Sequence, residues 1–217
     1  MDTRMHVVNL SHPLELISHP LDGQILEVLS GADAQFTGRQ VHSLLRKRSP
    51  RGVRLSLDRL CRQGIVSAEM AGRATLYRLN RSHLAAAHVL ALAHLRYEFI
   101  RRLRAAFASW DPQPAVAYLF GSSARRESNA ASDVDICIIR PTSVDDPDRP
   151  DWRQQIDAIS RDVSSWTGND TRILEFAETE VLDRLDSDPV LTSIREDGVC
   201  VAGDAELLRH QRRSLEP

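Results

Sequence analysis

Residues 117–140, AYLFGSSARRESNAASDVDICIIR, decide how the rest of the chain is interpreted. The stretch begins with an apolar run that ends in a Gly-Ser-Ser turn at Gly121, and it closes with a second apolar run that opens at Asp133. Apolar runs of this length, bounded by small and polar residues, are typical of buried strands. We therefore predict two β-strands, with a turn and a short helix from about Ala124 between them.

The second strand begins with two carboxylates on one side. Side chains alternate along a strand, so Asp133 and Asp135 point the same way while Val134 points to the other face. Adjacent carboxylates repel each other unless a cation or a proton lies between them. Mg²⁺ prefers oxygen ligands and relieves that repulsion. The alternative is an acidic turn that ends an edge strand and binds no metal.

The Gly-Ser-Ser turn has the composition of a phosphate site. Small residues at Gly121, Ser122 and Ser123 let backbone N–H groups and hydroxyls approach a phosphate, and the start of a following helix favours its charge. A phosphate site beside paired carboxylates is the equipment of metal-assisted phosphoryl or nucleotidyl transfer.

The combined pattern resembles the nucleotidyltransferase signature of the DNA polymerase β-like superfamily, in its minimal, MNT-type form. The residues that carry the resemblance are 119–122, Ala124, Arg125 and 132–135. One departure is Arg126, where the family usually has a glycine. The resemblance implies Mg²⁺ or Mn²⁺ as the metal and a nucleoside triphosphate as the substrate, with ATP as the favoured one. The nucleotide would bind at Gly121, Ser122, Ser123 and Arg125. Arg125 has an alternative partner in Glu127.

A third apolar strand at 171–176 contains one carboxylate, Glu175. The resemblance implies a third metal ligand on a strand of this kind, usually an aspartate. In the site that the resemblance implies, Asp133 and Asp135 hold two metal ions. Glu175 completes the second metal site and accepts the proton of an attacking hydroxyl. The alternative is a solvent-facing residue on an edge strand.

The composition, 42% hydrophobic and 27% charged, is ordinary for a globular chain. We find no apolar run of membrane-spanning length and no secretory leader, so we expect a cytoplasmic protein. The three cysteines, Cys61, Cys137 and Cys200, are odd in number and far apart, which indicates reduced thiols.

Charge divides the chain unequally. Residues 1–80 carry 11 Lys/Arg against 7 Asp/Glu, residues 81–110 carry 5 against 1, and residues 111–217 carry 12 against 22. A basic front and an acidic back indicate two modules with different partners.

Residues 1–80 resemble a winged helix-turn-helix domain. Thr37 is a helix N-cap, and Ser49 followed by proline is a second helix start. The turn at 71–73 joins two short strands. The predicted elements are helices at 24–29, 38–45 and 50–63 and strands at 65–69 and 74–79.

The third helix and the hairpin carry charge suited to double-stranded DNA. Between positions 46 and 62 the chain has seven Lys/Arg against Asp58 alone. Such charge provides sequence-independent affinity for phosphates. We expect groove contacts from the third helix and a backbone or minor-groove contact from the hairpin tip. The predicted DNA-binding residues are Arg46, Lys47, Arg48, Arg51, Arg54, Ser56 and Arg73. The alternatives are a solvated basic face and a protein-binding winged helix.

The stretch 81–110 contains no Gly or Pro, and its apolar residues recur at three- and four-residue steps. We predict one long helix that connects the modules and packs against a second copy in a homodimer. The alternative is a helix that only covers the catalytic sheet.

These patterns predict an α+β protein. We assign a winged helix-turn-helix domain to residues 1–80, a connecting and dimerisation helix to 81–110, a nucleotidyltransferase domain with a small mixed β-sheet flanked by helices to 111–203, and a flexible tail to 204–217. Three functions stay open. The first is transfer of a nucleoside monophosphate to a hydroxyl of a protein, an RNA or a small molecule, with a toxin partner as one acceptor that the resemblance implies. The second is transcription regulation by nucleotide sensing without turnover, and the third is a structural adaptor.

Overall fold

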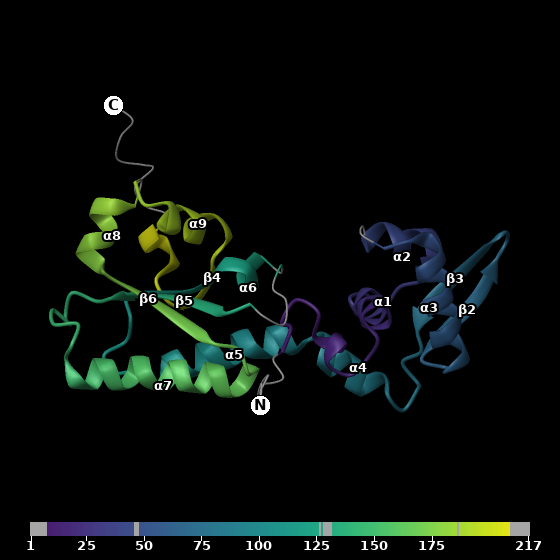
Figure 1. Cartoon of the computed structure of the whole chain (residues 1–217), viewed down its shortest axis with the longest axis horizontal. Coiled ribbons are helices and arrows are strands. Elements are labelled where there is room, and N and C mark those ends of the chain that lie inside the picture. Colours follow the sequence, from purple (N-terminus) through teal and green to yellow (C-terminus); the bar gives the residue numbers. More distant parts are fainter. Residues whose placement is uncertain (1–7, 46–47, 126, 128–131, 186, 209–217) are drawn as a thin grey trace, which may run out of the picture. The chain divides into compact units, whose positions relative to one another are not determined.

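The computed structural model describes residues 8–45, 48–125, 127, 132–185 and 187–208 (Figure 1). The chain divides into two compact units. We call the described residues 12–97 the N-terminal unit, and the described residues 8–11 and 98–208 the C-terminal unit.

Two helices of the N-terminal unit, α2 and α3, begin at side-chain caps that the sequence provides. The Thr37 side chain accepts a hydrogen bond from the backbone N–H of Gln40, and the Gln40 side chain accepts one from Thr37 in return. The Ser49 hydroxyl accepts a hydrogen bond from the backbone N–H of Gly52, with proline at the first helical position. The helices are η1 (Pro13–Leu16), α1 (Pro20–Ser30), α2 (Gly38–Leu44), α3 (Pro50–Arg62) and α4 (Ala86–Ala93).

Three antiparallel strands complete this unit in the order β1-β3-β2. They are β1 (Phe36–Thr37), β2 (Val66–Ala71) and β3 (Ala74–Leu79). Strands β2 and β3 form a hairpin whose turn contains Gly72 in the left-handed region, at φ +62°. The core beneath the sheet is made by buried residues of α1, α2 and α3, among them Ile25, Val41 and Leu57.

The predicted helix at 81–110 is two helices, which corrects the sequence analysis. Helix α4 ends at Ala93, His94 caps it, and α5 runs from Leu95 to Ala108. Val89 of α4 packs into the core of the N-terminal unit, whereas Leu103 of α5 packs into the core of the C-terminal unit. The apolar stripe is continuous in the sequence, but it serves two different cores.

The C-terminal unit is built on a mixed sheet with the order β6-β5-β4-β7. Strands β5 and β6 are parallel, and the other neighbours are antiparallel. After α5 its elements are β4 (Val116–Phe120), α6 (Gly121–Arg125), β5 (Val134–Arg140), α7 (Pro150–Thr167), β6 (Thr171–Ala177), α8 (Glu178–Arg184), α9 (Pro189–Asp197), β7 (Val199–Gly203) and η2 (Ala205–Leu208). The predicted α+β class, with a small mixed sheet flanked by helices, is confirmed for this unit.

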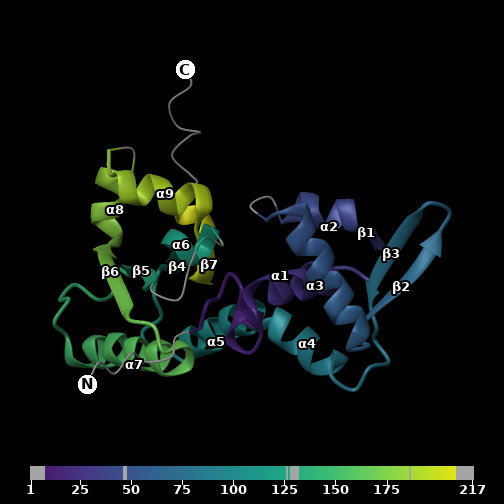
Figure 2. The same ribbon diagram turned by 45° about the vertical axis from the view of Figure 1, so that its right-hand side comes forward.

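Helices cover both faces of this sheet. Helices α5 and α7 lie on one face, and α8 and α9 lie on the other (Figure 1). Figure 2 shows the same layers after a turn of 45°. The alternation along β5 divides the core accordingly, with Ile136 and Ile138 toward α5 and α7, and Cys137 and Ile139 toward α8 and α9. On β5, even-numbered residues therefore point to the layer of α5 and α7, and odd-numbered residues point to the layer of α8 and α9.

The chain after Gly203 is folded as far as it is described. Leu208 is buried, and the Tyr118 hydroxyl donates a hydrogen bond to the carbonyl of Ala205 over 3.1 Å. The segment 204–208 is thus part of the C-terminal unit rather than of a flexible tail, and the rest of the predicted tail, 209–217, lies outside the described residues. In the described part of the chain, no helix has the length and apolar character needed to cross a membrane.

Candidate functional site

The structure brings together the turn and the carboxylate strand of residues 117–140. Phe120, the last residue of β4, pairs with Asp135 of β5. Gly121 follows with φ +69°, and a Cβ atom at this position would lie only 2.5 Å from Oδ2 of Asp135. Glycine is therefore required here both by its backbone conformation and by the closeness of the carboxylate.

Asp133 and Asp135 form the acidic half of the site. The Asp133 side chain keeps 25% of its surface exposed. Burial raises the pKa of Asp135, and the nearby charge of Asp133 raises it further, while Arg172 and Arg125 act in the opposite direction. Burial is thus the main cause of the raised pKa of Asp135, and Arg172 opposes it more strongly than Asp133 adds to it.

Arg172 completes this cluster, and the sequence analysis missed it. Arg172 of β6 pairs in register with Asp135, so both lie on the face toward α8 and α9. Its Nη2 atom lies 2.6 Å from Oδ2 of Asp133. The third side chain at the acidic pair is therefore a cation. Alternation along 171–176 does place Arg172 and Glu175 on opposite faces, but only the register shows which of them joins the pair.

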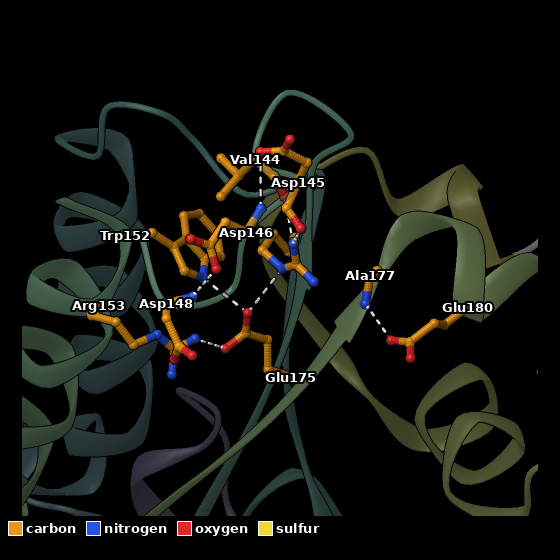
Figure 3. Close-up of polar contacts among 10 residues, drawn as sticks. Val144, Asp145, Asp146, Asp148, Trp152, Arg153, Glu175, Ala177 and Glu180 are labelled. Atoms are coloured by element: carbon orange, nitrogen blue, oxygen red, sulfur yellow. Dashed lines mark hydrogen bonds and ion pairs between the residues drawn. The ribbon is translucent and has the colours of Figure 1, made fainter. Parts of the chain in front are cut away.

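Glu175 lies on the other face of the sheet, and the prediction that it joins Asp133 and Asp135 is wrong. It pairs with Ile138, whose side chain enters the layer under α7. The Trp152 indole N–H donates to Oε1 of Glu175 over 2.9 Å, and Arg153 bonds Oε2 (Figure 3). Among the described residues no group of three or more His, Cys, Asp or Glu is placed to hold a metal ion.

The alternative interpretation of Glu175 as a solvent-facing residue is also wrong, because only 17% of its side chain is exposed. The Nε atom of Arg140 lies 3.1 Å from Oε1 of Glu175. Arg140 also donates to the backbone carbonyls of Val144 and Asp145. Glu175 is thus an internal anchor that links α7, β5 and the connection after β5.

The predicted phosphate-binding residues are only partly available. Gly121 and Ser122 are half-buried, whereas Ser123 is 2% exposed, which removes it as a ligand-contacting residue. The Nε atom of Arg125 lies 3.1 Å from Oε2 of Glu127, the partner that the sequence offered as its alternative. Arg126, the departure from the family pattern, lies outside the described residues.

Two carboxylates two residues apart, Asp133 directly before β5 and Asp135 within it, fit a single hard cation with oxygen ligands, such as Mg²⁺. A two-metal site that needs a third carboxylate does not fit, because Arg172 takes the third position. The donor set therefore supports one divalent cation.

The candidate DNA-binding residues of the N-terminal unit separate into exposed and internal ones. Arg51, Arg54 and Arg73 are exposed, and Arg73 lies in the hairpin turn. Arg48 is half-buried, and its Nε atom donates to the side chain of Gln24 over 2.9 Å. Arg46 and Lys47 lie outside the described residues.

Ser56 does not contact a groove, which corrects the sequence analysis. It is 2% exposed, and its hydroxyl accepts a hydrogen bond from Arg59 over 3.1 Å. Arg59 in turn pairs with Asp22 of α1. This network holds α3 on α1 and removes one arginine from the count of available positive charges.

The comparison with protein families agrees with the C-terminal geometry. Residues 105–182 match the family described as polymerase beta, nucleotidyltransferase. The match includes the Gly121 turn, the acidic pair and β6, and it supports the polymerase β-like nucleotidyltransferase superfamily for this segment. At the superfamily level it indicates nucleotidyl transfer. A comparison with curated proteins gave no match.

Proposed function

We propose that the protein is a nucleotide-responsive DNA-binding protein. Its C-terminal unit binds a nucleoside triphosphate, ATP first, together with Mg²⁺, and its N-terminal unit binds double-stranded DNA. The observation that carries the nucleotide half is the approach of the Gly121 turn to Asp135, which puts a turn of small residues beside a carboxylate pair.

Different residues bind the phosphates and the metal ion of the nucleotide complex. The backbone N–H groups at Gly121 and Ser122, with the Ser122 hydroxyl, bind phosphate oxygens. Asp133 and Asp135 hold the divalent cation. When bound, Mg²⁺ neutralises charge on the triphosphate. Mn²⁺ has the same preference for oxygen ligands and serves as its substitute in experiments.

Binding without turnover is the form of this function that the site geometry favours. An attacking hydroxyl needs a base, and the carboxylate predicted for that role, Glu175, lies on the opposite face with three partners. Arg172 stands near the acidic pair instead, and a guanidinium accepts no proton. The expected result is a unit that senses nucleotide rather than consumes it.

The second candidate is catalysis, namely transfer of a nucleoside monophosphate to a hydroxyl of a protein, an RNA or a small molecule. The family match over residues 105–182 and the two aspartates favour it. A toxin partner is one acceptor for such a reaction.

The DNA half is supported by the order of elements and by charge. A capped helix α3 followed by a β-hairpin is compatible with the winged helix-turn-helix that we propose for this unit. Residues 12–97 carry 12 Lys/Arg against 6 Asp/Glu, and Arg51, Arg54 and Arg73 are exposed. Such a surface provides affinity for phosphates.

We also propose that the protein is a homodimer, since two copies read two half-sites. Leu84, before α4, is 96% exposed, and Tyr97 of α5 is 71% exposed. Both side chains lie within residues 81–110, the segment that the sequence analysis assigns to dimerisation.

One experiment separates the two nucleotide functions. The purified protein is incubated with Mg²⁺ and α-labelled ATP, and binding, label transfer and pyrophosphate release are measured together. Saturable binding without transfer supports the sensor, and transfer of label to protein or RNA supports the enzyme. If the protein binds no nucleotide and Asp135→Asn behaves like the wild type, the nucleotide half of the proposal is wrong.

A further inference from the structure

The position of Arg172 in the candidate nucleotide site has a consequence for the cations that the site takes. A third carboxylate here would give the cluster three negative charges. With Arg172 beside Asp133 and Asp135, the three side chains carry a formal net charge of one negative unit. A second divalent cation would be repelled by the guanidinium and would lack a ligand.

Arg172 is free to change partner. Its side chain is 75% exposed and that of Asp133 is 25% exposed, so water screens the ion pair and makes it weak. A triphosphate offers the guanidinium a stronger, bidentate partner. A cation on the triphosphate at the same time offers Asp133 a replacement for Arg172.

Other arginines of the C-terminal unit are less suited to this role. Arg125 pairs with Glu127, and its charge lowers the pKa of Asp135 less than that of Arg172 does. Arg140 and Arg153 are engaged with Glu175 on the opposite face of the sheet. Among these described arginines, Arg172 is the one whose side chain contacts the acidic pair.

We propose that Arg172 is a phosphate-binding residue that takes the place of a second metal ion. The nucleotide then binds with one divalent cation, and Arg172 moves from Asp133 to the triphosphate. This inference rests on the proposed nucleotide binding and specifies how it occurs.

The first test counts metal ions. Mn²⁺ binding is measured by electron paramagnetic resonance with saturating amounts of a non-hydrolysable ATP analogue. The wild type takes one Mn²⁺ per bound nucleotide. Arg172→Asp supplies a third carboxylate and takes two, and without nucleotide it binds Mn²⁺ more tightly than the wild type. Arg161→Asp, the same charge change at an exposed position of α7, leaves both quantities unchanged.

The second test measures the phosphate contact. Arg172→Gln weakens binding of the ATP analogue about 10- to 100-fold, the range for a lost hydrogen bond to a charged group, while Arg161→Gln has no effect. Equal melting temperatures of wild type and Arg172→Gln would show that the lost affinity comes from a lost phosphate contact and not from a loss of fold.

Three results would overturn the inference. Two Mn²⁺ per nucleotide in the wild type would contradict the one-cation site. An unchanged affinity of Arg172→Gln for the ATP analogue would contradict the phosphate contact. Either result leaves the proposed nucleotide binding intact. If wild type and Arg172→Asp both fail to bind the analogue, the proposed function itself is wrong.

Discussion

The carboxylates on the two faces of the C-terminal sheet differ in burial and in the strength of their ion pairs. On the face toward α7, Glu175 is surrounded by a tryptophan N–H and two arginines and is largely buried. On the face toward α8 and α9, Asp133 and Asp135 repel each other, and their cationic neighbour, Arg172, is mostly exposed. A carboxylate whose partners are internal stabilises the fold, whereas a pair with a weak partner is available to a ligand.

Removing Glu175 should have the largest effect on stability. Glu175→Ala leaves Arg140, whose side chain is 10% exposed, without its counter-ion. Breaking one side of such a buried pair costs about 3–5 kcal/mol, so the free energy of unfolding should fall by this amount in urea titrations.

Glu180 offers the matched control for this change. Its carboxylate is exposed and accepts one hydrogen bond, from the backbone N–H of Ala177 over 2.8 Å (Figure 3). Glu180→Ala should cost no more than about 1 kcal/mol. Equal losses in the two variants would contradict the assignment of Glu175 as an anchor.

Gly121→Ala should disturb the site at Asp135, on the opposite face of the sheet. The new Cβ atom meets Asp135, and the left-handed backbone adds about 1–2 kcal/mol of strain. We expect nucleotide binding, followed by calorimetry, to be lost together with this stability.

Gly72→Ala separates the two causes. Gly72 also has a positive φ, at +62°, but a Cβ atom there meets nothing within 4 Å. This variant should lose stability through strain alone and keep its nucleotide affinity. Loss of nucleotide binding in both variants would indicate a general effect of folding.

The same distinction between exposed and internally partnered side chains applies to α3. Arg54 is exposed, whereas Ser56 is buried against Arg59. Arg54→Ala should reduce the slope of log affinity against log salt by about 1 for a DNA duplex, measured by fluorescence anisotropy. Ser56→Ala should leave this slope unchanged. An unchanged slope for Arg54→Ala would show that Arg54 does not contact DNA phosphates.

The smallest effect is expected for Asp135→Asn. Because burial raises the pKa of Asp135 in the folded chain, this carboxyl contributes stability below its unfolded pKa and loses that contribution as pH rises through the folded pKa. Near neutral pH the asparagine variant should therefore be slightly more stable, by less than about 1 kcal/mol in the free energy of unfolding, and should melt at a slightly higher temperature. As pH falls below the ordinary pKa of an aspartate, about 3.9, the carboxyl becomes protonated in both states and the difference should shrink. A lower melting temperature at neutral pH would contradict the burial of this charge.

Much of this fold follows from local patterns. The cap residues Thr37 and Ser49 place α2 and α3, and the apolar runs place β4, β5 and β6 within one or two residues of their observed bounds. These features depend on neighbouring residues, which is why the sequence contains them.

The errors concern contacts between elements. Arg172 and Glu175 are three residues apart, and an odd spacing changes the face of a strand, so the choice between them needed the register of β6 against β5. The break at His94 could not be predicted because the apolar stripe continues into a second core. Ser56 was predictable, since positions 53, 56, 57 and 60 form one buried helix face.

Strand β7 returns from the end of the described chain to pair with β4, and Leu208 closes the layer behind it. A fragment cut at residue 182, where the family match ends, would leave β4 with unpaired N–H and C=O groups along one edge. Such an edge recruits other chains, so truncated preparations of this unit should aggregate. Fragments intended for crystallisation or spectroscopy should extend to at least residue 208.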